Sequence, residues 1–470
     1  MVTVMEKWAD LYGQETGVYE MNLVGKTYVT VCTEDKAMEL VKLRPYIAQR
    51  GSTIREAALS IGASGVFAAE QEEWIAEHKL VRSALNRLAV GDFLAIMIKT
   101  TDRLVQKWME QCEVGNGNTT TVVKDIHVDL GNCTADAIAA VSMDQDFDFL
   151  NHPDSGVAMD MDTIMEGALK RALSPVWYWR IPCIGQYLDG IGFARDRIWS
   201  LVSQVVRNYE RDSIKSTASS SPQKKTFLSK LFDMMHSDKV KLAHDRVIGN
   251  IVTLFLAGTD TTSKSLASAF YFISKDLKLQ CNLRMEAETL DLTTATLEDF
   301  YSKLPRLKSF LHEIHRMYGV PWLFLQAAKE VTFCGTVLPK GTNFALLTKY
   351  PSTSKTSPSK DVPLGPKGEA PSEFCPERYL LHDEDTGKLS CSSPSTKGAG
   401  FMVFGQGMRS CPGRTYSEIF SYAAVVSILQ TFDIKLAPNH PEPTWEFDVV
   451  MVPDCGVSMQ LSKRVPVRQR

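Results

Sequence analysis

The sequence predicts a mainly α-helical protein with a minor β part. Apolar residues recur at spacings of three and four along most of the 470 residues, which is typical of amphipathic helices. The stretch 244–275 is the longest such segment, and its centre is apolar nearly all round, which indicates a long buried helix. Short strand-like segments at about 15–35 and 446–461 indicate the β part. We expect all of these in one domain, 1–470.

Turn residues and the apolar period predict the elements in order. Two short strands are expected in 17–31, on either side of Gly25-Lys26, because β-branched and aromatic residues flank this turn. Strands are also expected at 330–334 and 343–347, followed by a long irregular stretch to about 400 that is rich in Pro, Ser and Gly. Helical periodicity predicts helices at 33–43, 68–110, 123–145, 160–212 (in two pieces, broken at Pro175 and at Ile181-Pro182), 244–275, 298–318 and 414–431, with a Ser-rich loop at 213–226.

Charge and composition exclude several classes of protein. Lys and Arg number 52 and Asp and Glu number 55, so the net charge is −3. The chain therefore lacks the overall positive charge that favours binding to nucleic acid. With 44% hydrophobic and 23% charged residues, the chain is not a disordered protein. Its 10 cysteines include no C-x-x-C pair, which argues against a zinc ribbon or thioredoxin motif, and their scatter indicates a reducing compartment.

No apolar run reaches the roughly 18 residues of a transmembrane helix. The N-terminus carries Glu6 and Asp10 early and lacks the basic start and apolar core of a secretory signal. The chain as given is therefore expected to be cytoplasmic. The aromatic and apolar stretch from Trp177 to Tyr187 suits either ordinary core packing, which we favour, or a peripheral contact with a membrane.

The segment 404–413, FGQGMRSCPG, carries the most chemical information. Cys411 follows a glycine-rich loop and precedes a helical pattern. Glycine lets a backbone approach a ligand closely, and the start of a helix favours a thiolate, which is a good metal ligand. Arg409 is a fixed cation that suits a carboxylate. A buried structural cysteine is the alternative, and the spacing of the surrounding residues argues against it.

This segment resembles the cysteine-ligand loop of the cytochrome P450 superfamily of haem-thiolate monooxygenases, F-x-x-G-x-R-x-C-x-G. The resemblance implies haem b as the cofactor, with Cys411 as the ligand of its iron. It implies that Phe404 packs beside the sulfur and that Arg409 pairs with a haem propionate. Gly407 and Gly413 complete the matched positions.

Two further segments resemble this family's motifs. Glu313 and Arg316 match its E-x-x-R on a helix, and Arg378 matches the arginine of its P-E-R-F segment. The resemblance implies that these three residues form a buried structural triad behind the thiolate. In isolation, an acid and a base three residues apart would be read as a surface pair.

The segment 257–262, AGTDTT, lies in the middle of the predicted long helix and matches the family's A-G-x-D/E-T-T. These residues are poor helix formers, so a local cause such as a kink is expected. The resemblance implies that Asp260 and Thr261 are the acid–alcohol pair that delivers protons to dioxygen. It also implies that Ala257 and Gly258 keep side-chain bulk away from the haem face.

The propionate ligands depart from the family pattern. Trp74 begins a W-x-x-x-R/K-type segment, but His78 stands where Arg or Lys is usual, and Gln326 stands where the strand after E-x-x-R usually carries Arg or His. Lys79 and Lys329 are alternative cations. If His78 holds a propionate, its pKa should be raised, and haem should be lost faster on the alkaline side of neutrality.

The substrate pocket is expected to be apolar, because such pockets orient lipophilic ligands with few polar contacts. The resemblance covers essentially the whole chain, but the N-terminal anchor helix and Pro-rich hinge of membrane-bound eukaryotic members are missing. A truncated chain and a soluble form both stay open; an anchored form would lie on the cytosolic face of the endoplasmic reticulum. Predicted pocket residues are Val252, Phe255, Leu256, Val320, Trp322 and Leu323.

The sequence thus predicts a monooxygenase that inserts one atom of O2 into a lipophilic small molecule, with electrons from an NADPH-dependent reductase. The long loops at 351–400 resemble eukaryotic insertions. Two alternatives are a haem-thiolate isomerase or lyase acting on hydroperoxides and a non-catalytic haem-binding protein. The intact Asp260-Thr261 pair argues against both.

Overall fold

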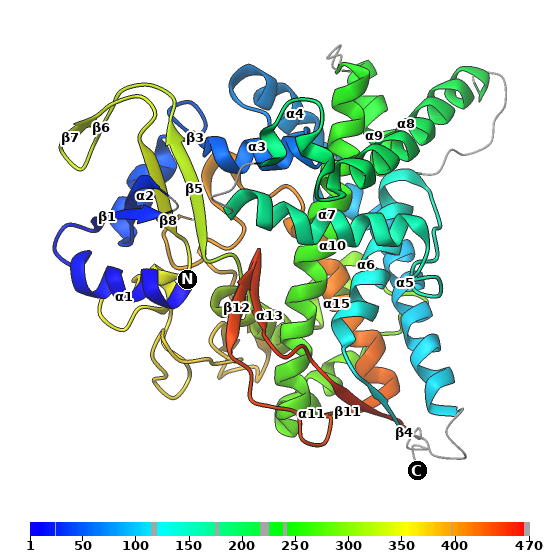
Figure 1. The fold of residues 1–470 in the computed structure, drawn as a ribbon. Helices are drawn as coiled ribbons and strands as arrows, with labels where there is room; N and C mark the ends of the chain where they lie inside the picture. The colour runs from blue at the N-terminus through cyan, green and yellow to red at the C-terminus, as the bar shows by residue number, and fades with distance from the viewer. Residues whose placement is uncertain are drawn as a thin grey trace.

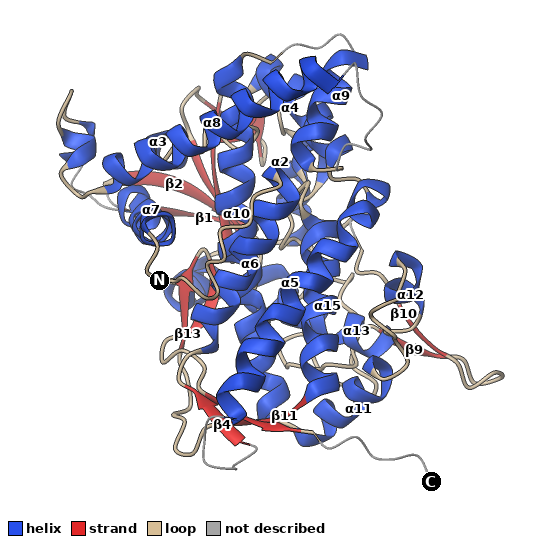
Figure 2. Cartoon of the chain, turned by 90° about the vertical axis from the view of Figure 1, so that its right-hand side faces the viewer, coloured by secondary structure: helices blue, strands red, loops and turns tan. Residues whose placement is uncertain are grey.

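The computed structural model describes residues 1–23, 25–113, 120–173, 178–216, 225–237, 242–395 and 397–464. Four long helices lie side by side at its centre (Figures 1 and 2): α5 (Arg87–Glu113), α6 (Ile126–Met143), α10 (His244–Lys275) and α15 (Arg414–Thr431). Most side chains of α6, α10 and α15 are buried, which explains why their apolar pattern lacks a polar face. The predictions of a mainly helical fold and of helices at 244–275 and 414–431 are confirmed.

The segment predicted as one helix at 298–318 forms two, α12 (Leu297–Ser302) and α13 (Pro305–Tyr318). Pro305 occupies the first turn of α13, where its missing N–H costs nothing, whereas the middle of a longer helix would not tolerate it. Glu286 accepts hydrogen bonds from the backbone N–H groups of Arg306 and Leu307 at this new end. The remaining helices are α1 (Val2–Tyr12), α2 (Glu34–Lys42), α3 (Ser52–Ser60), α4 (Gln71–Ala84), α7 (Gly156–Leu173), α8 (Ile191–Ser216), α9 (Phe227–Ser237), α11 (Leu277–Ala287), α14 (Tyr350–Thr353) and the 3₁₀ turns η1 (Tyr178–Arg180), η2 (Gly185–Tyr187) and η3 (Gly407–Arg409).

The main sheet has five strands in the order β1-β2-β8-β5-β3 and lies beside the helical bundle (Figure 1). Only the β2–β8 pair is parallel. Apolar clusters cover both faces of the sheet. Its strands are β1 (Val18–Leu23), β2 (Lys26–Val31), β3 (Ala48–Arg50), β5 (Trp322–Ala327) and β8 (Asn343–Leu347).

The predicted C-terminal β part divides between two pairings. β12 (Trp445–Asp448) and β13 (Val450–Pro453) form a hairpin, and β14 (Met459–Lys463) pairs with β4 (Thr120–Val123) and β11 (Phe432–Leu436). The long stretch 351–400 is mostly irregular, as predicted, and contains the short pair β9 (Leu380–His382) and β10 (Leu389–Cys391). The two other short strands are β6 (Val331–Phe333) and β7 (Thr336–Leu338).

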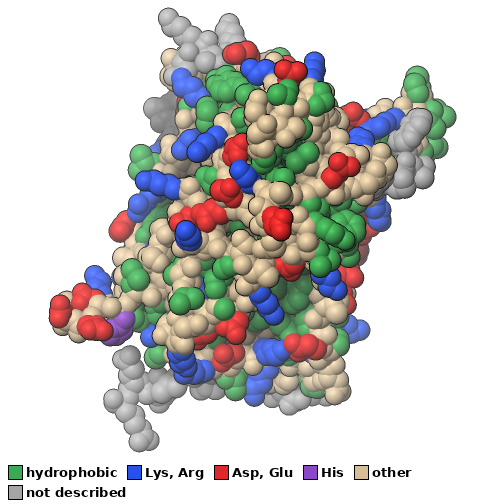
Figure 3. All heavy atoms as spheres, turned by 90° about the vertical axis from the view of Figure 1, so that its left-hand side faces the viewer, with side chains coloured by type: hydrophobic (Ala, Val, Ile, Leu, Met, Phe, Trp, Pro, Cys, Tyr) green, Lys and Arg blue, Asp and Glu red, His purple; other side chains and the backbone are tan. Residues whose placement is uncertain are grey.

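Some predicted features lie outside the described residues, namely the break at Pro175, Trp177 and most of the Ser-rich loop, 217–224. Among the residues that the structure describes, no helix is long and apolar enough to cross a membrane. Figure 3 shows acidic and basic side chains interspersed, with apolar side chains between them, on the face of the molecule that it presents.

Candidate active site

The loop around Cys411 is built by two glycines and a helix start. Gly405 and Gly407 have φ values of 66° and 67°, which favour glycine, and they turn the chain back so that the Cys411 N–H donates to the Phe404 carbonyl at 2.7 Å. Helix α15 begins directly after the loop, at Arg414. Burial raises the pKa of the Cys411 thiol, while the backbone N–H groups of Gly413 and Arg414 act to lower it.

Cys411 is both accessible and desolvated. Part of its surface is exposed, yet burial is the largest influence on its thiol. The exposed part therefore faces an enclosed space rather than bulk solvent. Phe404 stands behind the loop, edge-on to the buried His315 on α13, with ring centroids 5.2 Å apart. Cys411 is thus partly exposed in a loop whose Phe404 ring is supported by α13.

One stripe of α10 also faces an open space. Ala257 is exposed in the middle of an otherwise buried helix, and Leu254, Thr261 and Ser265, which lie three or four residues apart on the same face, are partly accessible. The Thr262 hydroxyl lies 3.2 Å from the Ser417 hydroxyl of α15, so this part of α10 lies close to the helix that follows Cys411. The stripe places the Thr261 hydroxyl next to the Ala257 carbonyl, to which it donates at 2.7 Å.

The helix continues through 257–262, and the Thr259 and Thr261 hydroxyls bond the carbonyls one turn back, which gives these polar side chains partners within the helix. One expectation for this segment is wrong. Gly258 does not serve the open face: a Cβ there would lie 2.7 Å from Ile138 Cδ1, so this glycine permits close packing of α10 on α6. Ala257 alone keeps the open face small.

Asp260 is buried beside this stripe. Its Oδ1 lies 2.6 Å from Lys264 Nζ, one turn along α10, and Lys264 Nζ lies 2.8 Å from Asp448 Oδ2 at the end of β12. Asp260 Oδ2 is buried and has no hydrogen-bond partner. Burial raises the pKa of Asp260, with Lys264 opposing this shift. The carboxyl is thus next to Thr261 in the chain and connected to a partly exposed carboxylate through one lysine.

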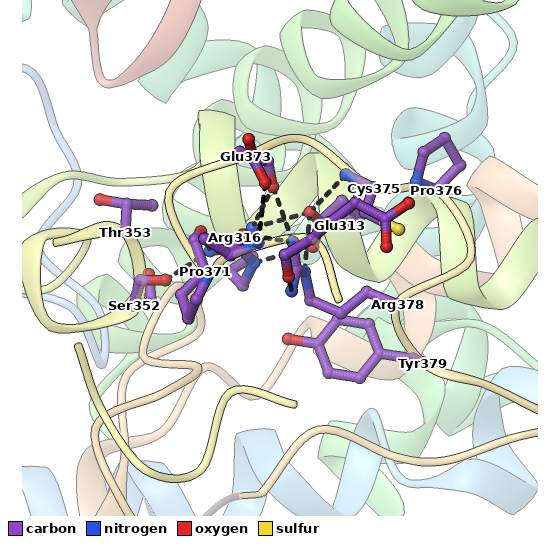
Figure 4. Close-up of polar contacts among 12 residues, drawn as sticks. Glu313, Arg316, Ser352, Thr353, Pro371, Glu373, Cys375, Pro376, Arg378 and Tyr379 are labelled. Carbon is purple, nitrogen blue, oxygen red and sulfur yellow. Dashed lines mark hydrogen bonds and ion pairs between the residues drawn. The ribbon is translucent and has the colours of Figure 1, made fainter. Parts of the chain in front are cut away.

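Glu313, Arg316 and Arg378 come together as a fully buried cluster (Figure 4). Glu313 accepts two hydrogen bonds from Arg316, both at 2.7 Å, and one from Arg378 at 3.1 Å. The guanidiniums also donate to main-chain carbonyls of the loop wrapped around them. These carbonyl acceptors belong to Ser352, Pro363, Glu369, Ala370, Pro371 and Glu373.

A second cluster of cations surrounds Glu70. Arg409 donates to its carboxylate and Arg50 donates a backbone N–H to it at 3.0 Å. Burial lowers the pKa of Arg44 to about 10 and that of Arg50 to about 9, with like charges in the cluster adding to the effect, and both values keep the side chains cationic at neutral pH. Nε of Arg44 and Nε and Nη1 of Arg409 are buried without hydrogen-bond partners. Because three arginines face a single carboxylate, the cluster has unsatisfied hydrogen-bond donors and a net positive charge, both of which suit an anionic ligand.

Trp74 and His78 border this cluster. Their rings stack with centroids 4.5 Å apart, and the Arg409 guanidinium lies 4.6 Å from the Trp74 ring. His78 Nε2 is buried without a partner. Burial lowers the pKa of His78, with the charges of Arg82 and Arg409 adding to this effect. A propionate beside the ring would act in the opposite direction, so faster haem loss on the alkaline side of neutrality stays a prediction.

The structure does not bring the other proposed propionate ligands to the cluster. Leu325, the neighbour of Gln326 in β5, pairs with Arg50, and alternation along the strand turns Gln326 to the opposite face of the sheet. There Gln326 donates to Asn343 at 3.0 Å. Lys79 and Lys329 are exposed.

The six predicted pocket residues lie on α10, on β5 and on the segment before β5. Val252, Phe255 and Leu256 are buried in the main helical core. Phe255 stacks on Phe149 there, with ring centroids 6.2 Å apart. The three residues lie beside the open stripe of α10 and are not part of it. Trp322 packs against Phe447 with ring centroids 4.3 Å apart. Leu323 lies on the other face of β5, because strand side chains alternate, and Val320 precedes that strand, its carbonyl accepting from Thr348.

Comparison with known proteins decides the family. A family model described as Cytochrome P450 matches residues 1–459. The chain belongs to the cytochrome P450 family. Membership implies a haem cofactor with a cysteine ligand.

Named relatives of this cytochrome P450 differ in kingdom and organisation. It is 28% identical over 230 residues to human mitochondrial sterol 26-hydroxylase, covering 48% of the chain and 40% of the relative. It is 20% identical over 420 residues to pentalenene oxygenase of Streptomyces avermitilis, covering 88% and 84%. It is 23% identical over 426 residues to a bifunctional cytochrome P450/NADPH–P450 reductase, ALT2, of Alternaria alternata, covering 89% and 35%. The chain spans half or less of the sterol hydroxylases that it matches.

The residues present fit a haem. The loop of Cys411 provides a thiol open on one side, with backbone N–H groups directed at the sulfur. The arginine cluster provides buried donors without partners, which suit two carboxylates. Four residues of the site were not predicted from the sequence: Arg44, Arg50, Glu70 and Leu254. Of these, only Leu254 carried a local signal, because it stands three residues before Ala257 and therefore lies on the same face of a helix.

Proposed function

We propose that this cytochrome P450 is a monooxygenase that inserts one oxygen atom of O2 into a lipophilic small molecule, with electrons that come from NADPH through a reductase. The observation that carries the proposal is the open stripe of α10. It presents the Thr261 hydroxyl beside the buried acid Asp260 in a helix packed near the Cys411 loop. The haem supplies the oxygen chemistry when bound, and the chain supplies its ligand, its anchoring and its protons.

Cys411 would ligate the iron, with Phe404, Gly407 and Gly413 shaping its loop. The propionates would be held by Arg44, Arg50 and Arg409, which together with Glu70 carry a net charge of +2 at neutral pH, enough to neutralise two carboxylates. Trp74 and His78 would pack at the edge of this cluster.

Arg44→Gln is expected to speed loss of haem, because hydrogen bonds to charged groups are worth about 1.5–3 kcal/mol, or roughly a tenfold to hundredfold change in rate. The measurement is haem transfer to apomyoglobin. Lys329→Gln is the matched control, since Lys329 is exposed. Haem retention in Arg44→Gln equal to that of the control would contradict the arginine site.

Thr261→Ala is expected to keep haem bound while NADPH consumption is uncoupled from product, with hydrogen peroxide released instead. Proton delivery by a positioned side chain contributes roughly 10²–10⁴-fold, so most of the product should disappear. The check is the ratio of product to NADPH oxidised, with Ser265→Ala, on the same face of α10, as the control. Unchanged coupling in Thr261→Ala would contradict the role of Thr261 in proton delivery.

The names of the relatives support a sterol or terpenoid as substrate class, and the fused reductase of ALT2 supports an NADPH-dependent partner. A peripheral membrane contact is supported by the exposed apolar side chains between α7 and α8 and at the start of α8. These side chains are Ile181, Ile184, Leu188 and Phe193. We also propose that the whole chain, 1–470, is one domain.

The proposal is tested by incubating the haem-loaded protein, NADPH and a cytochrome P450 reductase with cholesterol and with a sesquiterpene hydrocarbon under ¹⁸O₂. A product with one ¹⁸O atom supports the monooxygenase. Conversion of a fatty-acid hydroperoxide without NADPH or O2, with no labelled product, would instead support the isomerase. Binding of haem with neither reaction would favour the non-catalytic alternative.

A further inference from the structure

Three charged side chains lead from the protein surface to the centre of α10. Asp448, whose side chain is 47% exposed, contacts Lys264, which contacts Asp260; the last two side chains are 8% and 10% exposed. We infer that Asp448 and Lys264 are the inlet through which protons from solvent reach Asp260 and the face of α10 that carries Thr261. The inference deepens the proposed function and rests on it.

The fold holds the three groups in line. Asp448 is the last residue of β12, and the hairpin turns at Val449, whose φ is 62°. The hairpin lies beside α10 (Figure 1), where the Ser268 hydroxyl donates to the Met451 carbonyl of β13 at 3.4 Å. Lys264 lies one helical turn after Asp260 on the same face. The carboxylate at the hairpin tip is therefore fixed over the lysine by backbone structure on both sides.

The charges of the group favour uptake of a proton. Two carboxylates and one ammonium leave a net charge of −1, and Asp260 Oδ2 is a buried acceptor without a partner. Burial also raises the pKa of Asp260. His127 of α6 lies 3.5 Å from the Ser263 hydroxyl, and burial lowers its pKa, with Lys264 adding to this effect and Asp260, Asp125 and Asp448 opposing it.

The transfer of one proton returns Asp448, Lys264 and Asp260 to their starting protonation states. The Lys264 ammonium gives a proton to Asp260 and recovers one from Asp448, which has taken it from water. Asp260 then releases its proton toward the open face of α10, and no charge is stored. Lys264 and Asp260 are both buried, whereas Asp448 is partly exposed. Lys264 and Asp448 act through Asp260, so they are positioning residues.

The test uses O2 itself as the probe, since no other substrate is needed. The haem-loaded protein with NADPH and a reductase reduces O2 either to H2O2, with one NADPH, or to two molecules of water, with two NADPH and more protons. Asp448→Asn and Lys264→Gln are expected to lower the fraction of electrons that end in water, by about tenfold given the size of positioned proton transfers, and to enlarge the solvent deuterium isotope effect. Lys264→Arg should restore part of both.

Lys275→Gln and Glu442→Gln are the matched controls, because this pair, 2.6 Å apart, also joins α10 to the segment before β12 but does not contact Asp260. A second readout that does not depend on turnover is the rate of H/D exchange of the Asp260 carboxyl, followed by infrared spectroscopy of the carbon monoxide complex; it should slow in Asp448→Asn and be unchanged in the controls. Unchanged water yield and exchange in Asp448→Asn would overturn the inlet. A wild-type protein without a thiolate-type carbon monoxide spectrum would overturn the proposed function on which it rests.

Discussion

Replacing Glu313 with Gln is expected to cause one of the two largest losses that single substitutions produce in this protein. The change leaves Arg316 and Arg378, both fully buried, without their shared counter-charge. Breaking a buried ion pair by removing one partner typically costs about 3–5 kcal/mol. The loss should appear in the free energy of unfolding by urea and as poor retention of haem.

The control for this substitution is Glu377→Gln. Glu377 pairs with Arg306 at 3.4 Å in the same part of the fold, but both side chains are partly exposed, and such pairs contribute about 0–1 kcal/mol. Equal stability of the two variants would contradict the view that the buried triad holds the loop of Figure 4 in place.

Cys411→Ser is expected to abolish the thiolate-type carbon monoxide spectrum, because a hydroxyl stays protonated near neutral pH and donates poorly to iron. Cys455→Ser serves as control, since Cys455 is also exposed but lies at the end of the β12–β13 hairpin. An unchanged spectrum in Cys411→Ser, or its loss in Cys455→Ser, would show that Cys411 is not the ligand.

The long helices could be predicted from the sequence because local signals mark them. Helix α10 has the predicted limits, since apolar residues recur at helical spacing on both sides of 257–262 and Asp276 caps the helix that follows. The strand β4 was not predicted, because a distant partner determines it: β4 pairs with β14, where Val123 lies opposite Met459. Pro305 was a local signal for the break between α12 and α13 that the apolar period concealed.

The candidate site shows the same division. The motif residues Cys411, Asp260 and Glu313 stand in local patterns that the sequence displays. Arg44 and Arg50 do not, because an arginine near a strand is usually a solvated surface residue, and only the tertiary fold buries these two beside Glu70. Gln326 was assigned by its place after E-x-x-R, and strand alternation turned it to the other face of the sheet.

Lys264 and Asp448 illustrate a third case. Lys264 stands four residues after Asp260, a spacing visible in the sequence, but such pairs are usually exposed. Nothing local connects either residue to Asp448, more than a hundred positions away along the chain. The contact between Lys264 and Asp448 depends on the β12–β13 hairpin, which lies against α10. The sequence indicated this hairpin only as a strand-like segment.

The central claim, that Cys411 makes this cytochrome P450 a haem-thiolate protein, is tested most directly by the carbon monoxide difference spectrum of the reduced wild-type protein. We expect the strongly red-shifted Soret band of thiolate ligation, with haem bound one to one. A band typical of histidine ligation in the intact, fully loaded protein would contradict the claim.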